Sequence, residues 1–243
     1  MLPLGEGRVD TGGSAADTGA MTLRLYLHPF SSYCQKVLIA LYEREVPFEP
    51  VEVNLGDPEQ RAALAALWPV AKFPVLRDEA RGATVPESTL IVEYLDRVHP
   101  GPPPLVPADP DVALEVRILD RFIDNYLHTP MQKIVADNFR PQESRDTFGV
   151  DEAKRQVTIA YDILEERLAA NGGPWAAGEA FTLADCSAAP PLFYAGMIVP
   201  FDDRPTLSAY FQRLRARPSF ARAVDEARPY RGWFPPGWRE GWD

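Results

Sequence analysis

Cysteine is scarce in this chain of 243 residues: only Cys34 and Cys186 occur, far apart in sequence. Two distant cysteines exclude a disulfide framework and a cysteine-rich metal cluster, so we expect no metal site. The scarcity fits a reducing compartment, and we expect a cytoplasmic protein. A long uninterrupted apolar run is also lacking. The longest apolar stretch, 184–201, is interrupted by Asp185 and a Pro-Pro pair, which favours a buried core helix over a membrane span.

Basic residues are in deficit. Lys and Arg number 25 against 35 Asp and Glu, which gives a formal net charge of −10. An acidic surface repels phosphate backbones and anionic lipid, so neither nucleic acid nor a membrane is an expected partner. Residues 1–20 lack the apolar segment of a secretory signal and the arginine content of a transit peptide, so we expect a disordered extension there.

The residue pattern differs between the two halves of the chain. In 21–99, runs that alternate like strands are interspersed with runs at helical spacing. The expected strands lie at 23–27, 51–55, 72–76 and 83–85, and the expected helices lie at 31–45, after Asp57-Pro58 and at 87–98. This order predicts an α/β domain with a mixed sheet.

A proline-rich break at 99–104 follows this domain, with a linker expected over 100–111. Beyond it, 112–243 shows helical patterns only, which predicts an all-helical second domain. Its expected helices cover 112–137, the region around 157–168, a segment that opens at Thr182, 207–214 and 219–227. Thr182 and Asp185 have the spacing of a capping box at the start of the third of these helices.

The first candidate for chemistry is Ser31-Ser-Tyr-Cys34, between the first strand and the first helix. A helix N-terminus presents unpaired amide groups and a partial positive charge, and such a site favours an anion. Serine is also a preferred N-cap, so helix capping alone explains either serine equally well.

Two further junctions have the same character. In Lys72-Phe-Pro74, a proline stands at the start of a strand, where it cannot donate a hydrogen bond to the neighbouring strand. This indicates a turn, and a cis peptide bond is one form that such a turn takes. The turn would leave the backbone of Phe73 free to bind something other than the sheet. In Pro86-Glu-Ser88, the amide and hydroxyl of Ser88 can bind a carboxylate, while Glu87 can accept from an ammonium group. One carboxylate and one ammonium describe an amino-acid head group. An ordinary loop and simple helix capping are the respective alternatives.

Together these motifs resemble those of the cytosolic glutathione transferases, over nearly all of 22–236. The motifs are Leu25-Tyr-Leu-His-Pro-Phe-Ser-Ser-Tyr-Cys-Gln-Lys-Val37, Lys72-Phe-Pro-Val-Leu76, Pro86-Glu-Ser88, Phe181-Thr-Leu-Ala-Asp185 and Arg217-Pro-Ser-Phe220. The resemblance implies the glutathione transferase fold: an α/β thioredoxin-like N-terminal domain, an all-α C-terminal domain and, usually, a homodimer. It also implies glutathione as co-substrate and a small electrophile as second substrate, in a detoxification reaction. The electrophile is expected between the first domain and the long helix after the linker.

The resemblance implies a serine-type enzyme with a role for each matching position. Ser31 would be the catalytic residue and would donate a hydrogen bond to the thiol sulfur of glutathione. Four residues would bind the rest of the tripeptide: Lys72 near the glycyl carboxylate, the Phe73 backbone at the cysteinyl part, Glu87 at the γ-glutamyl amino group and Ser88 at the γ-glutamyl carboxylate.

The strength of one hydrogen bond decides whether Ser31 can lower the pKa of the glutathione thiol enough to form the thiolate at neutral pH. A free thiol titrates near pKa 8.5, so only a few per cent is thiolate at neutral pH. A hydrogen bond to a charged group contributes roughly 1.5–3 kcal/mol, which corresponds to about 1–2 pKa units. Ser31 and the helix N-terminus together are therefore strong enough to bring the bound thiol below neutrality. The expected reaction is conjugation of the glutathione thiol to an electrophile.

Several alternatives stay open from the sequence. One is a non-catalytic glutathione-transferase-like binding module; another is a glutathione-dependent thiol reductase or isomerase that uses Cys34, which is otherwise a buried apolar residue. Ser32 is an alternative to Ser31 as the thiol donor. The polar residues of the long helix, among them Asp120, Asp124 and His128, are interpreted as a solvated face or as inter-helix contacts without a catalytic role.

Overall fold

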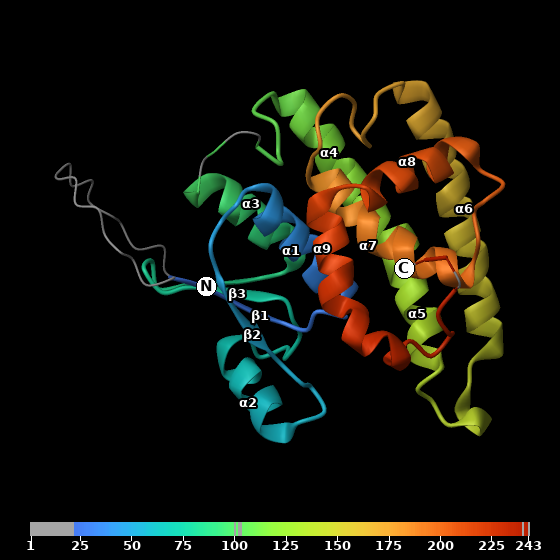
Figure 1. The fold of residues 1–243 in the computed structure, drawn as a ribbon. Helices are drawn as coiled ribbons and strands as arrows, with labels where there is room; N and C mark the ends of the chain where they lie inside the picture. The colour runs from blue at the N-terminus through green and yellow to red at the C-terminus, as the bar shows by residue number, and fades with distance from the viewer. Residues whose placement is uncertain (1–21, 100, 102–103, 240, 243) are drawn as a thin grey trace.

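The computed structural model describes residues 22–99, 101, 104–239 and 241–242. The extension expected at 1–20 lies outside the described residues. Figure 1 shows a sheet with its helices on the left and a group of helices on the right, in contact along a broad seam. An α/β part is therefore followed by an all-helical part, as predicted.

The sheet contains β2 (Glu49–Glu52), β1 (Leu23–Leu27), β3 (Val75–Asp78) and β4 (Ala83–Pro86), side by side in that order. β1 runs parallel to β2, whereas the β1–β3 and β3–β4 pairs are antiparallel. The prediction of a mixed sheet is confirmed.

Helices cover both faces of this sheet. The alternating residues Leu23, Leu25 and Leu27 are buried in one cluster with residues of α1 (Ser32–Glu43) and α3 (Ser88–Val98). On the other face, α2 (Pro58–Leu67) packs Leu64 into a smaller cluster that includes Tyr26. The two-residue period of β1 thus separates the two faces.

Two strands begin and end elsewhere than predicted. The second strand is Glu49–Glu52 rather than 51–55, and it is an edge strand that tolerates Pro50. The third begins at Val75 rather than Lys72, because Pro74 has no amide hydrogen to donate to the ladder. Within α3, Leu90 is exposed although it is apolar.

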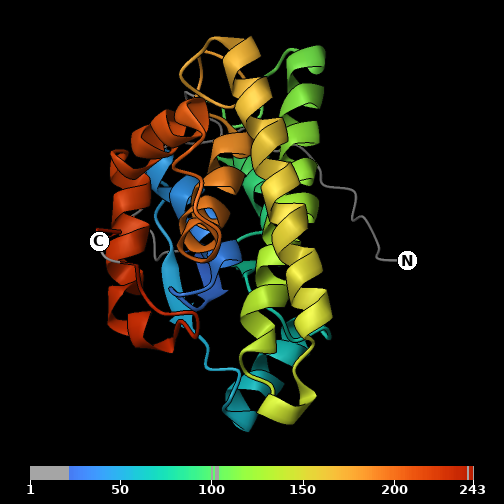
Figure 2. The same cartoon turned by 90° about the vertical axis from the view of Figure 1, so that its right-hand side faces the viewer.

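The long helix predicted over 112–137 is α4 (Pro110–Phe122), η1 (Ile123–His128) and α5 (Thr129–Asp137), joined without a break. The segment η1 is a π-helix, a form that sequence periodicity does not reveal. In Figure 2 this composite helix, in green, lies beside the long yellow α6 (Thr147–Asn171). The short turns η2 (Gln142–Ser144) and η3 (Arg228–Trp233) are 3₁₀ helices.

At the centre of the helical part lies α7 (Leu183–Ile198), nearly all of which is buried. The predicted capping box forms at its start, where the Thr182 amide donates to the Asp185 carboxylate at 2.8 Å. Among the described residues, no helix combines the length and apolar character needed to cross a bilayer. The apolar stretch after Thr182 is therefore core, as predicted.

The two parts of the molecule share one hydrophobic core. α1 packs against α7 and also against α9 (Pro218–Ala227), which follows α8 (Pro205–Arg215). Figure 2 shows α1 and α7 between α9 on one side and the composite helix on the other. The start of α1 is therefore held by residues of the helical part, and this sets up the site.

Candidate functional site

A cavity of about 630 Å³ lies where the ends of β3 and β4 and the start of α1 face the composite helix. Both parts of the molecule line it. From the first part come Tyr33, Trp68, Val70, Lys72, Phe73, Pro74, Glu87, Ser88, Thr89, Leu90 and Glu93, and from the second come Arg117, Asp120, Arg121, Asp124, Asn125 and Thr129. A cleft with apolar rings and convergent charged groups is the usual form of a small-molecule site.

Four of the five predicted site residues line this cavity together: Lys72, Phe73, Glu87 and Ser88. Ser31 does not line it, although Tyr33, two residues further along α1, does. The structure thus brings the predicted binding residues together and leaves the predicted catalytic serine just outside their cavity.

The Phe73–Pro74 peptide bond is cis, which is one of the forms that the proline allowed at this turn. Pairing between β3 and β4 begins at Val75, which pairs with Pro86. The backbone of Phe73 therefore lies outside the sheet, beside the cavity, where its polar groups can bind a ligand.

Glu87 occupies the N-cap position of α3 with φ of 69° and makes no side-chain capping hydrogen bond. A positive φ is uncommon for a non-glycine residue, and such strained positions cluster at functional sites. Ser88 is the first helical residue and is buried. Ser88 is therefore not the N-cap of α3, and the alternative that it serves only as a cap is wrong.

Ser31 is the N-cap of α1. Its backbone is extended, with φ of −81° and ψ of 119°, and its hydroxyl accepts from the Cys34 amide at a long 3.4 Å. The hydroxyl proton is not used in that bond. Ser31 therefore caps the helix and keeps a donor next to the free amides of its first turn.

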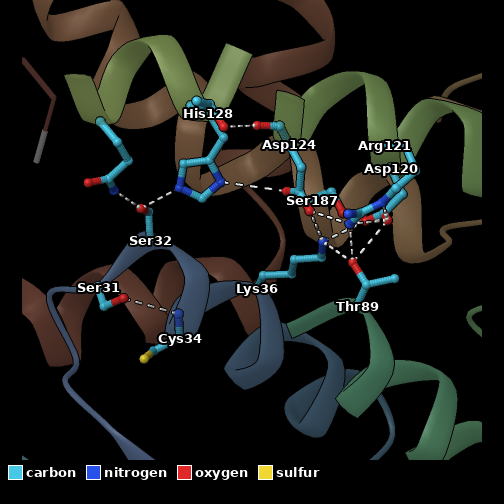
Figure 3. A network of polar contacts seen from close by, with 12 residues as sticks. Ser31, Ser32, Cys34, Lys36, Thr89, Asp120, Arg121, Asp124, His128 and Ser187 are labelled. Carbon is cyan, nitrogen blue, oxygen red and sulfur yellow. Dashed lines mark hydrogen bonds and ion pairs between the residues drawn. The ribbon is translucent and has the colours of Figure 1, made fainter. Parts of the chain in front are cut away.

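Ser32 points the other way. Figure 3 shows its side chain directed at His128 of the composite helix, while Ser31 faces Cys34. Ser32 Oγ lies 2.6 Å from His128 Nε2 and accepts from Gln132 Nε2 at 3.0 Å. The adjacent serines, which the sequence could not tell apart, thus have different surroundings.

Cys34 is completely buried. Burial is the largest influence on its thiol and raises the pKa to about 12, despite the opposing contact with Ser31. Because the thiolate is the nucleophilic form, this environment disfavours a reductase that works through Cys34. Cys34 therefore fits the other prediction made from the sequence, a buried apolar residue without a catalytic role.

A charged network lies between α1 and the composite helix (Figure 3). Lys36 Nζ lies 2.5 Å from Asp120 Oδ1 and 3.1 Å from Asp124 Oδ2, and it donates to Thr89 Oγ1 at 2.9 Å. Arg121 closes the network by pairing with both aspartates from the cavity side. Two positive and two negative side chains thus neutralise one another at the seam.

Of the two interpretations given for the polar residues of this helix, inter-helix contact is the one that applies to Asp120, Asp124 and His128, which are all buried. Their spacing of four residues, opposite the single Lys36 in an apolar run of α1, was the available signal. The other interpretation, a solvated helix face, holds for Asn125 and Tyr126, which are exposed. The buried residues Asp120, Asp124 and His128 contact α1.

Charge and burial act in opposite directions on the titration of this network. Burial alone would raise the pKa of Asp124, but the neighbouring His128 and the charges of Lys36 and Arg121 outweigh it and lower the pKa to about 2. Burial lowers the pKa of His128, against the pull of Asp124. At neutral pH, Asp124 is therefore ionised and His128 is neutral.

The model of the glutathione S-transferase N-terminal domain matches residues 25–103, and that of the C-terminal domain matches residues 125–218. Within the described residues, no group of His, Cys, Asp or Glu is arranged to hold a metal ion.

Relatives match over most of their length. A probable maleylacetoacetate isomerase of Caenorhabditis elegans is 30% identical over 210 residues, which cover 86% of this chain and 95% of the relative. A glutathione S-transferase of Methylobacterium radiotolerans, solved with glutathione sulfonate, has a TM-score of 0.72 at 31% identity and covers 83% of this chain and 94% of that one. One from Methylobacillus flagellatus, solved with glutathione bound, has a TM-score of 0.75 at 26% identity, with 83% and 98% covered. The chain belongs to the glutathione S-transferase family.

Proposed function

We propose that this protein is a serine-type glutathione S-transferase that activates the thiol of glutathione at the start of α1 and conjugates it to an electrophile. The observation that carries the proposal is the convergence of Lys72, Phe73, Glu87 and Ser88 on one cavity beside that helix start. Two related structures that contain glutathione or its sulfonate add support.

In this proposal the cavity holds the tripeptide by its charged ends. Ser88 binds the γ-glutamyl carboxylate at the N-terminus of α3, where helix amides favour an anion, and Glu87 accepts from the amino group. The Phe73 backbone pairs with the cysteinyl part, and Lys72 lies near the glycyl carboxylate. The sulfur is thereby directed toward the first turn of α1.

Ser31 is the donor to the sulfur in this proposal. Ser32 is buried and already bonded to His128 and Gln132, whereas the Ser31 proton is not used by its capping bond. When the thiol ionises, its proton leaves to solvent. The thiolate then attacks the electrophile and a carbon–sulfur bond forms. In a substitution the leaving group departs with its bonding electrons, and in a conjugate addition the π electrons move onto the acceptor, which takes a proton from solvent.

Ser31→Ala tests the role of Ser31. The pKa of bound glutathione should rise by about 1–2 units, because the thiolate loses a charge-assisted hydrogen bond. Ultraviolet absorbance of the thiolate against pH measures this. A titration curve identical to that of the wild-type protein would remove Ser31 from the mechanism.

Ser88→Ala tests the binding site, and turnover by the wild-type protein separates an enzyme from a non-catalytic binding module. The variant should bind glutathione about tenfold or more weakly by calorimetry, since a hydrogen bond to a carboxylate is lost. The wild-type protein should be retained on immobilised glutathione. Retention without turnover of any electrophile in a panel would favour the binding module.

A second candidate reaction is isomerisation of a cis alkene, which the similarity to a probable maleylacetoacetate isomerase favours. The same thiolate would add to the conjugated double bond, the new single bond would rotate, and elimination would regenerate glutathione. An assay with maleylacetoacetate distinguishes the two reactions, because isomerisation consumes no glutathione and conjugation consumes one equivalent.

We also propose that the protein acts as a homodimer in the cytoplasm. Apolar side chains are exposed on α3 and α4, namely Leu90, Leu114 and Ile118. Large apolar side chains that a folded chain leaves exposed are candidates for subunit contacts. Light scattering after size exclusion should give twice the chain mass, and Ile118→Glu should shift it toward the monomer. A wild-type protein that elutes as a monomer at micromolar concentration would contradict the dimer.

A further inference from the structure

The first turn of α1 is held from the helical part of the molecule by three contacts. Ser32 Oγ is 2.6 Å from His128 Nε2, and Gln132 Nε2 donates to the same oxygen at 3.0 Å. The rings of Tyr33 and His128 stack with centroids 3.6 Å apart and an interplanar angle of 17°. Ser32 and His128 are 2% and 1% exposed, so water does not compete for these contacts.

The direction of the Ser32–His128 bond follows from the charge behind the ring. His128 Nδ1 lies 3.7 Å from Asp124 Oδ1, and among the described residues neither atom has a hydrogen-bond partner. The carboxylate favours the tautomer with its proton on Nδ1, which leaves Nε2 as the acceptor. Ser32 therefore donates to His128 while accepting from Gln132, and its hydroxyl is fixed in both roles.

The backbone of η1 puts His128 in this position. Asp124 and His128 lie in this π-helical segment, and Thr129 Oγ1 donates to the Asp124 carbonyl at 2.8 Å. A π-turn inserted in an α-helix is rare and is frequent at functional sites. Here it directs both side chains at the seam with α1, as Figure 3 shows.

We propose that His128 is a positioning residue that holds the first turn of α1 through Ser32, and thereby keeps Ser31 in the orientation that stabilises the glutathione thiolate. The inference rests on the function proposed above. Ser31 and Ser32 are adjacent in the same turn, so a rotation of one moves the other. A donor must be held within about 0.5 Å of its productive position to be effective.

The proposed glutathione contacts predict how a substitution of His128 should affect the stabilisation of the thiolate and the affinity for glutathione. Glu87 is the N-cap of α3 and Ser88 is its first residue, so neither belongs to the first turn of α1. Loss of His128 should therefore weaken the stabilisation of the thiolate and leave the affinity for glutathione nearly unchanged. A purely structural role would instead lower stability without moving the thiol titration.

The experiment compares His128→Ala, His128→Gln and Ser32→Ala with Ser31→Ala, all with bound glutathione. Thiolate absorbance against pH should show the pKa of the thiol raised by about 0.5–1 unit in His128→Ala and in Ser32→Ala. His128→Gln should restore most of the wild-type value, because its amide oxygen can accept from Ser32. The dissociation constant of glutathione should change less than about threefold in each.

Ser219→Ala is the matched control. Ser219 is also buried, and its hydroxyl donates to Glu43 across the seam at the far end of α1. Its loss should lower stability and leave the thiol titration as in the wild type.

The outcomes separate the two proposals. A shift in Ser31→Ala without one in His128→Ala and Ser32→Ala overturns the role of His128 and leaves the proposed function standing. No shift in Ser31→Ala overturns the catalytic assignment itself. If His128→Ala does not fold, Ser32→Ala decides, because it removes a single hydroxyl oxygen: a shift supports the role of His128, and a wild-type curve contradicts it.

Discussion

Burial determines what each polar side chain at the start of α1 can do. Ser31 is partly exposed beside the helix amides, Ser32 is enclosed by two partners from the composite helix, and Cys34 has no accessible surface. Three residues of similar size within four positions thus have three different chemistries available. Their order in the sequence does not reveal which is which.

The thiol of Cys34 should be unreactive in the folded protein. Because burial raises its pKa to about 12, almost no thiolate exists near pH 8. Mass spectrometry after iodoacetamide treatment should show neither Cys34 nor Cys186 modified, and both modified in denaturant. Cys34→Ala should keep glutathione-dependent activity within about threefold, at a stability cost of about 1 kcal/mol for the lost sulfur. Rapid alkylation of the folded chain would contradict this.

Asp124 should make stability depend on pH in the acid range. Its pKa is about 2 in the folded protein, against about 3.9 when unfolded, which corresponds to roughly 2–3 kcal/mol. Since the folded pKa is the lower one, this contribution is complete above about pH 4 and is lost as the pH falls toward 2. Urea unfolding between about pH 5 and pH 3 should show a steeper decline for the wild type than for Asp124→Asn. Parallel declines would contradict the assignment.

At the scale of elements, two helix N-termini show how much a cap can be worth. Asp185 is fully buried and accepts from the Thr182 amide, the Ala176 amide and the Tyr210 hydroxyl, at 2.7–2.8 Å. Asp57 caps α2 at the surface by accepting from two amides of its first turn. The capping box at Asp185 was expected from the sequence, and the two caps differ in burial.

Asp185→Ala should therefore cost far more than Asp57→Ala. The first leaves three buried donors without an acceptor, and we expect a loss of about 3–5 kcal/mol in the free energy of unfolding. The second exposes its amides to water and should cost about 1 kcal/mol. Denaturant unfolding of both variants measures the difference, and similar losses would show that the α7 cap is no more than a surface cap.

Elements whose signal is local were predictable from the sequence. The α7 capping box, the strand β1 and the cis turn at Pro74 were found because the residues that specify them are neighbours. The π-helix η1 was missed, because the spacing of apolar residues does not distinguish a single π-turn from the α-helix around it. In the site, the four residues that were predicted to bind glutathione line one cavity, whereas the contact between Ser32 and His128, which the sequence did not indicate, spans 96 positions.

For the whole molecule, the charged network joins the two parts. Lys36 is 1% exposed and carries a charge that α1 could not bury alone. Its partners Asp120 and Asp124 belong to the composite helix, and Ser187 of α7 also donates to Asp120. The thioredoxin-like part and the helical part therefore neutralise each other's buried charges, and each depends on the other's position.

Lys36→Met should destabilise the molecule by about 3–5 kcal/mol, because Arg121 is then the only charged partner that the described part of the chain gives to the two buried aspartates. Lys133→Met is the matched control: Lys133 pairs with Asp146 at 3.5 Å, but both side chains are about half exposed. An exposed pair contributes less than about 1 kcal/mol. Urea unfolding at one fixed protein concentration keeps any contribution from subunit association constant.

A double variant tests whether charge, rather than packing, is the cause. Adding Asp120→Asn to Lys36→Met removes one of the uncompensated charges and should recover part of the lost stability, since a neutral amide costs less to bury than an unpaired carboxylate. If the double variant is as unstable as the sum of the two single variants, the aspartates are not coupled to Lys36 by charge. Equal losses in Lys36→Met and Lys133→Met would likewise show that the seam does not depend on this network.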